Sequence, residues 1–256
     1  MQNDGFIAVF DSGVGGISVL RALVAELPHE RFSYFGDSAN APYGERSEGE
    51  ILRLTHTHIE TFIDNGAKAV VIACNTATSV AARSLRAAYP DIPIIGVEPA
   101  LKPAAEAFPG GNILVMATPV TLALDKYHDL AARIDKSCTV HAVACPELAA
   151  RIERGNLDAP DVRELVESYV GAYRGRVDAV VLGCTHYPFI ASAIRDVLGD
   201  VRLFDGGAGT ARQLRRRLAA VNELAPDTEP GAVEFSSSLD TSEELALYRE
   251  LFSIPL

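Results

Sequence analysis

The chain has 256 residues, 48% hydrophobic and 22% charged, which is the composition of an ordinary globular protein with a core of its own. Its formal net charge of −11, from 23 basic and 34 acidic residues, argues against a nucleic-acid-binding protein, because that function needs a basic surface. Only residues 212–217 are locally basic, and we interpret them as a solvated helix face.

The N-terminus and the cysteines bear on cellular location. Residues 1–5 are polar, carry no positive cluster and lead into a strand pattern, which predicts no targeting segment. No apolar run approaches the roughly 18 residues of a membrane span. We therefore expect a cytoplasmic protein without membrane contact, whose four cysteines are reduced. None of them forms a C-x-x-C pair, so we expect no metal site.

Strand and helix patterns alternate along the chain, which predicts an α/β fold with mainly parallel sheets. In the first part, the expected strands are 6–10, 31–35, 68–73 and 92–97, and the expected helices are 15–27, 48–65 and 79–88. The series then starts again, with strands at 112–117, 138–144, 177–183 and 201–204 and helices at 101–108, 119–134, 148–155, 161–173, 188–198 and 209–222. A strand pattern at 232–235 and a helix near 243–252 end the chain.

This repetition predicts two pseudo-symmetric α/β halves that face each other across a cleft. Residues 97–99 and 204–207 are the candidate crossovers between the halves. Because open α/β sheets bind ligands at the carboxyl ends of their strands, the cleft is the expected active site.

Two cysteines occupy matching positions in the two halves. Cys74 follows the apolar run 69–73, and Cys184 follows the apolar run 179–183. Each thiol should therefore emerge at the carboxyl end of a buried parallel strand. Two thiols in one cleft can act as acid and base on opposite sides of a substrate, so this pair is the strongest functional signal. A single cysteine would more simply be a small hydrophobic residue of the core.

Polar residues beside these cysteines extend the candidate site. Asn75, Thr76 and Thr185 offer hydrogen bonds suited to the carboxylate and ammonium groups of an amino acid. His186 lies two residues after Cys184, which places both on the same side of an extended segment.

The glycine-rich segment 10–16 follows the first strand and opens a helix. Such a turn lets the backbone approach a ligand, and the helix N-terminus favours an anion such as a carboxylate. It is not a dinucleotide fingerprint, because Ser18 stands where the third glycine would be needed. Asp11 and Ser12 are expected to point into the cleft, although the glycines alone are equally typical of a tight turn. The loop 37–44, which contains Tyr43, is taken by itself as structural.

Together these segments resemble the glutamate racemase family, within the cofactor-independent aspartate/glutamate racemase superfamily. The resemblance spans about residues 6–210, in the expected order, and rests on segments 10–16, 34–37, 42–44, 73–77, 96–99 and 182–188. It implies two α/β domains with the active site in the interdomain cleft, one from residues 1–97 plus 206–256 and the other from 98–205.

The resemblance also implies the chemistry. Cys74 and Cys184 would be the two bases, with Cys74 acting on D-glutamate and Cys184 on L-glutamate, and with Asp11 and His186 assisting them. It implies no cofactor, a homodimer, and supply of D-glutamate for peptidoglycan. No lysine follows a site-like loop, so pyridoxal phosphate is not expected. The implied substrate-binding residues are Asp11, Ser12, Pro42, Tyr43, Gly44, Asn75, Thr76, Thr118, Thr121, Thr185 and His186.

Glu153 is ambiguous. From its short helix after Pro146 we expect it at the surface, whereas the resemblance assigns it a supporting role near Cys184. We leave it outside the candidate site.

Three other functions are compatible with these residues. An aspartate or broad-specificity racemase shares the family motifs. A thiol hydrolase or lyase would use Cys184 activated by His186, but it leaves Cys74 unexplained. In a non-catalytic amino-acid-binding protein, both thiols would be incidental.

Overall fold

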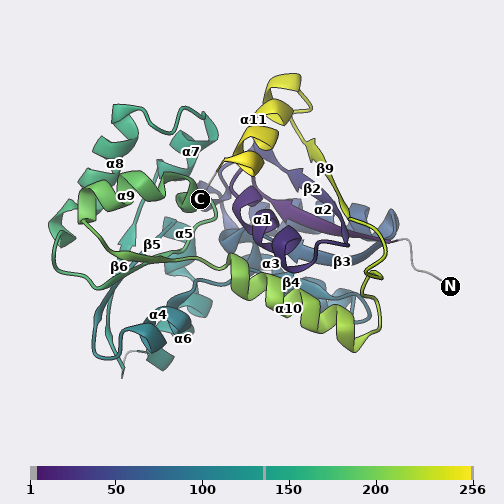
Figure 1. Cartoon of the computed structure of the whole chain (residues 1–256), viewed down its shortest axis with the longest axis horizontal. Coiled ribbons are helices and arrows are strands. Elements are labelled where there is room, and N and C mark those ends of the chain that lie inside the picture. Colours follow the sequence, from purple (N-terminus) through teal and green to yellow (C-terminus); the bar gives the residue numbers. More distant parts are fainter. Residues whose placement is uncertain (1–4, 135–136, 255–256) are drawn as a thin grey trace.

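The computed structural model describes residues 5–134 and 137–254, and within these ranges the strands form two separate sheets. Figure 1 shows the sheets side by side, with the first at the right and the second at the left. The strands of the first sheet, in spatial order, are β4 (Ile94–Gly96), β3 (Ala67–Ile72), β1 (Phe6–Asp11), β2 (Arg31–Gly36) and β9 (Ala232–Ser237). Those of the second are β6 (Thr139–Ala144), β5 (Asn112–Ala117), β7 (Ala179–Leu182) and β8 (Arg202–Phe204).

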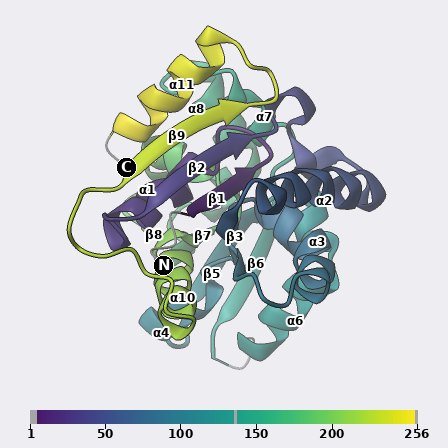
Figure 2. The same ribbon diagram turned by 90° about the vertical axis from the view of Figure 1, so that its right-hand side faces the viewer.

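The two sheets share one topology. In each, the first strand in the chain lies between the second and the third, and the fourth pairs with the third. Every strand pairing among the described residues is parallel. The expected α/β fold with two pseudo-symmetric parallel sheets is therefore confirmed, and β9 is an added strand at the edge of the first sheet, beside β2 (Figure 2).

Helices cover both faces of the first sheet, which explains why its central strands read as continuous apolar runs. One face packs against α1 (Ile17–Glu26), α10 (Gly207–Ala220) and α11 (Ser242–Ser253). The other packs against α2 (Glu48–Asp64) and α3 (Asn75–Ala88). Short 3-10 turns, η1 (Ser38–Asn40) and η2 (Tyr43–Glu45), lie in the loop after β2.

The second sheet is covered in the same way. One face packs against α7 (Leu148–Glu153), α8 (Pro160–Val170) and α9 (Ala191–Leu198). The other packs against α4 (Leu101–Ala107) and α6 (Asp125–Ile134), with α5 (Pro119–Ala123) before α6. The turns η3 (Gly171–Tyr173) and η4 (Tyr187–Ile190) follow α8 and precede α9. Within the described ranges, no helix is both long and apolar enough to cross a membrane.

The largest differences from the expected helices occur at two places, and the other helix boundaries shift by up to three residues. The helix expected at 79–88 begins four residues earlier, at Asn75, because the Cys74 thiol caps it by accepting the backbone N–H of Ala77 at 3.4 Å. Asn and Thr have low helix propensity, which hides this start in the sequence. The helix expected at 119–134 is interrupted at Leu124, which has extended backbone between α5 and α6.

Candidate active site

A narrow cavity of about 10 Å³, about the space of one water molecule, lies where strands of both sheets end. Cys74 follows β3 and Cys184 follows β7, so each sheet supplies one thiol to the same cavity. The remaining lining residues are Ser12, Pro42, Tyr43, Gly44, Asn75, Thr76, Thr118, Ala149, Gly183, Thr185 and His186. Most of the predicted substrate-binding residues are thus brought together.

The Cys74 thiol is buried at the N-terminus of α3. It donates a hydrogen bond to Ser12 Oγ at 3.7 Å and accepts the backbone N–H of Ala77. Burial, together with the nearby Asp11 carboxylate, raises the pKa of Cys74 to about 12, and the hydrogen bond from the Ala77 N–H lowers it by a smaller amount. This wall of the cavity therefore favours a protonated thiol.

The Cys184 thiol lies beside an imidazole. Its Sγ atom is 3.5 Å from His186 Nδ1, and His186 Nε2 is 2.5 Å from Glu153 Oε1. Burial opposes a positive charge on His186, but Cys184 and the Glu153 carboxylate together raise its pKa well above 6.5. The protonated ring can then donate through both nitrogens, to the sulfur and to the carboxylate.

Glu153 corrects the sequence interpretation, because it is not a surface residue. Besides His186, its carboxylate accepts the backbone N–H of Val14 at 3.0 Å. The anion at the glycine-rich turn before α1 is therefore this side chain of the protein itself. Ala149 and Glu153 are four residues apart on α7, which places them on the same face of the helix. Because Ala149 lines the cavity, this spacing is the signal that could have placed Glu153 near the site.

Asp11 lies behind the cavity wall and not on it. Its carboxylate accepts the Gly13 N–H at 3.0 Å and the Thr185 hydroxyl at 3.1 Å, and so connects the two sheets. Burial raises the pKa of Asp11 to about 6, although the positive charge of His186 pulls in the opposite direction.

The loop after β2 forms one wall of the cavity through Pro42, Tyr43 and Gly44, so it is more than a structural turn. The buried Tyr43 hydroxyl donates to Asp37 at 2.6 Å. Asp37 is buried, which alone would raise its pKa, but hydrogen bonds from His58, Tyr43 and Asn40 hold the pKa below its usual range. An ionised Asp37 is therefore a fixed anchor for this wall.

Three threonine hydroxyls join the two halves next to Cys74. Thr76 on α3 lies 3.1 Å from Thr118 and 3.1 Å from Thr121, which in turn are 2.9 Å apart. Thr121 is predicted to bind substrate but lies behind Thr76 and Thr118, outside the cavity lining. By contrast, Asn75 Oδ1 is buried without a hydrogen-bond partner, which makes it available to a donor on a ligand.

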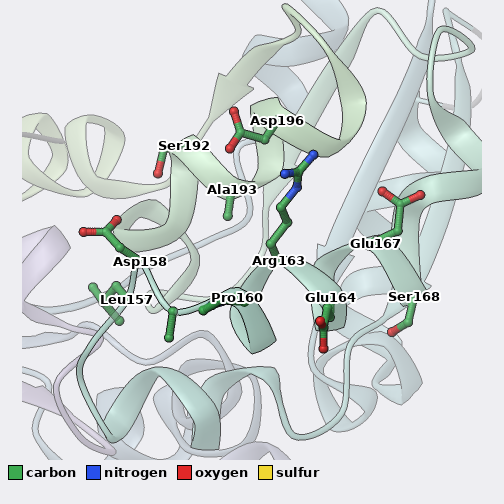
Figure 3. Close-up of a pocket in the computed structure, with 11 residues that line it drawn as sticks. Leu157, Asp158, Pro160, Arg163, Glu164, Glu167, Ser168, Ser192, Ala193 and Asp196 are labelled. Carbon is green, nitrogen blue, oxygen red and sulfur yellow. The ribbon is translucent and has the colours of Figure 1, made fainter.

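A larger groove of about 820 Å³ lies elsewhere, between α8 and α9. Figure 3 shows Arg163 of α8 in this groove, with Asp196 of α9 and Glu167 around it. It contains no thiol or imidazole, so its size does not make it the candidate active site. Among the described residues, no three His, Cys, Asp or Glu side chains are grouped to hold a metal ion.

Comparisons with known proteins identify the family of the chain. The model of the Asp/Glu/Hydantoin racemase family matches residues 12–214. A glutamate racemase of Clostridium perfringens is 44% identical over 250 residues, covering 97% of this chain and 96% of that protein. The structure of glutamate racemase isoform RacE1 from Bacillus anthracis is similar, with a TM-score of 0.87, 31% identity, and coverage of 99% of this chain and 96% of that one.

A second solved structure adds a ligand. The glutamate racemase of Francisella tularensis, determined in complex with D-glutamate, has a TM-score of 0.84 and 26% identity, covering all of this chain and 96% of that one. The matches extend over both sheets. The chain belongs to the Asp/Glu/Hydantoin racemase family.

Proposed function

We propose that the chain is a glutamate racemase that interconverts L- and D-glutamate with two cysteine side chains. The observation that carries this proposal is the pair of buried thiols, one from each sheet, that line the same cavity. The family relationship and the named relatives support the same substrate.

The reaction inverts one carbon centre. The thiolate of one cysteine removes the Cα proton of glutamate, and the thiol of the other cysteine delivers its proton to the opposite face of Cα. The C–H bond that breaks is replaced by the C–H bond that forms, and the two sulfurs exchange their protonation states. The next turnover can then run in the reverse direction without any added oxidant or reductant.

The surroundings prepare one acid and one base. We assign the role of base to Cys184, whose Sγ contacts the imidazolium of His186, and the role of acid to Cys74, which burial keeps protonated. In this resting state Cys184 is ready to deprotonate L-glutamate, and Cys74 is ready to deliver the proton that makes the D enantiomer. Turnover of D-glutamate requires the opposite state, with a thiolate on Cys74.

The carbanion formed at Cα is stabilised by fixed hydrogen bonds. As its charge moves onto the substrate carboxylate, donors already in place gain strength without reorganising. Ser12, Asn75, Thr76 and Thr185 line the cavity with such groups. Asn75 Oδ1 is suited to the substrate ammonium, because it is an acceptor without a partner.

Two further assignments belong to this proposal. Residues 1–97 with 206–256 form one domain and 98–205 the other, supported by the separation of the sheets and by the pairing of β9 with β2. The protein acts in the cytoplasm as a homodimer and supplies D-glutamate for peptidoglycan, in keeping with the resemblance of its motifs to that family.

The test is an optical assay on purified protein, with EDTA present and no cofactor added. Solutions of L-glutamate and of D-glutamate should converge on the same racemic end point, followed by circular dichroism. No change with either enantiomer would overturn the proposal. Comparable turnover of aspartate would identify a broad-specificity racemase, and hydrolysis of an ester or amide that depends on Cys184 alone would favour a thiol hydrolase.

A further inference from the structure

The C-terminal segment of β9 and α11 packs beside the loops of the active site without lining the cavity. β9 extends the first sheet next to β2, with Ser237 opposite Gly36, and α11 lies against the same face as α1 (Figures 1 and 2). No residue of this segment is among those that line the cavity within the described ranges. Its influence on the site must therefore pass through other residues.

Tyr248 on α11 makes the closest of these connections. It is fully buried, and its hydroxyl shares a hydrogen bond of 2.8 Å with Ser38 Oγ. A methyl group on Gly36 would lie 2.0 Å from the Tyr248 oxygen and 2.7 Å from the Gly13 carbonyl oxygen, so both groups close over this glycine. The phenol thus lies between the two loops that follow β1 and β2.

The loop after β1 is held through a second tyrosine. The rings of Tyr248 and Tyr34 meet edge to face at 5.4 Å, and the Tyr34 hydroxyl donates to the Gly13 carbonyl at 2.5 Å. Gly13 directly follows Ser12, which lines the cavity and accepts from Cys74. The packing of Tyr248 therefore fixes the ring that anchors this turn.

The loop after β2 is held at two points. Ser38, the partner of Tyr248, follows Asp37, which anchors Tyr43 in the cavity wall. One residue further, the Ala39 N–H donates to Ser238 Oγ at 3.0 Å, just beyond the end of β9. Both contacts come from the last part of the chain.

We propose that Tyr248 is a positioning residue for racemisation, which holds the loops after β1 and β2 in the geometry that binds the substrate. The proposal rests on the proposed function only for its kinetic readout. Burial raises the pKa of Tyr248, so the hydroxyl remains a neutral hydrogen-bonding group throughout the working pH range.

The variants remove the shared hydrogen bond from either end. Tyr248→Phe removes the hydroxyl and keeps the buried ring. Ser38→Ala removes the other partner without changing the ring, and it serves as the second test if Tyr248→Phe folds poorly. We expect each to raise the KM for both glutamate enantiomers about 5- to 10-fold while kcat changes less than about 2-fold, because the loop binds substrate without carrying the proton transfer. The double variant should be no worse than Tyr248→Phe alone, because that substitution already removes the hydrogen bonds of the phenol to Ser38 and to Ser237. Tyr89→Phe, a change far from the site, is the matched control.

Hydrogen–deuterium exchange of the backbone supplies a readout that needs no activity. Tyr248→Phe should speed exchange in residues 37–46, while residues 148–170 and the Tyr89→Phe control remain as in the unaltered chain. Unchanged KM, or unchanged exchange in residues 37–46, would overturn the proposal even if the melting temperature falls. If the unaltered chain does not racemise glutamate, the proposed function fails, and the exchange result alone decides whether Tyr248 holds the loop.

Discussion

The two walls of the cavity present the same thiol in unlike surroundings. On the first wall, Cys74 is buried, accepts a backbone N–H and lies close to the carboxylate of Asp11. On the second, Cys184 touches His186, which is itself held by Glu153. A racemase acts on two mirror-image substrates, but its site need not be a mirror. In the proposed reaction, this difference assigns the role of base to Cys184 and the role of acid to Cys74 when L-glutamate binds.

Removal of either thiol is the harshest test of this comparison. Cys74→Ser and Cys184→Ser should each lower racemisation of both enantiomers about 10³-fold or more, since general acid–base catalysis is worth about 10²–10⁴-fold. Steady-state rates followed by circular dichroism measure this loss. Cys138→Ser, a buried position outside the cavity lining, should retain normal activity. Full activity in Cys74→Ser or in Cys184→Ser would mean that the reaction needs only one of the two thiols.

The stability of Asp11 variants tests the first wall. Folding raises the pKa of Asp11 from 3.8 to about 6, so the fold favours the protonated acid and the carboxylate destabilises it. The stability that a neutral Asp11 contributes is complete below pH 4 and is lost as the pH rises through 6. Asp11→Asn should therefore raise the free energy of unfolding by about 3 kcal/mol at pH 7.5.

Urea denaturation at several pH values measures this gain, which should shrink steadily toward zero as the pH falls to 4. An Asp11→Asn variant that is less stable at pH 7.5 would contradict the assigned electrostatics of the first wall.

Loss of the imidazole tests the second wall. His186→Gln should lower kcat about 10- to 100-fold, because the Cys184 thiolate loses its positive partner. The residual activity should rise toward alkaline pH, where the thiolate forms without help. Rates measured between pH 7 and pH 10 would reveal this shift. A pH profile identical to that of the unaltered chain would mean that His186 does not act on the thiol.

Two neighbouring glycines allow the walls to be disturbed one at a time. A methyl group on Gly15 would lie 2.4 Å from His186 Nδ1, whereas one on Gly16 would lie 2.5 Å from the Cβ of Asp11. Gly15→Ala should therefore lower kcat about 10-fold and shift the pH profile as loss of the imidazole does. Gly16→Ala should lower kcat by a similar factor without that shift. Gly49→Ala, where a methyl group meets no atom within 4 Å, is the control. Identical pH profiles for Gly15→Ala and Gly16→Ala would contradict the different roles assigned to the two walls.

The sequence predicted the parts of the fold that depend on local pattern. The alternation of apolar runs and amphipathic helices placed the strands to within a few residues, and the matching settings of Cys74 and Cys184 marked the site. The repeated pattern of strands and helices predicted two similar halves correctly, because both sheets have the same strand order. The start of α3 was missed because a thiol caps it, and cysteine is not among the usual capping residues.

The contacts that no local pattern reveals are those between distant segments. Glu153 reaches Val14 across 139 positions of sequence, and Tyr248 reaches Ser38 across 210. Both residues look ordinary on their own helices, and their roles arise from the helix face that tertiary packing turns toward the site. Thr121 is the opposite case, because its motif predicts a substrate-binding residue that does not line the cavity. Its hydroxyl instead lies 3.1 Å from that of Thr76, which does line the cavity.

Solvent isotope transfer during single conversions tests the two-thiol reaction most directly. The protein is incubated in deuterium oxide with fully protiated D-glutamate, and Cα is followed by NMR in both enantiomers at low conversion. The account predicts that the L-glutamate formed carries deuterium at Cα, donated by the second thiol, while the remaining D-glutamate stays protiated. L-Glutamate that retains the original proton, or deuterium entering both enantiomers at the same early rate, would show that one group serves both faces and would contradict it.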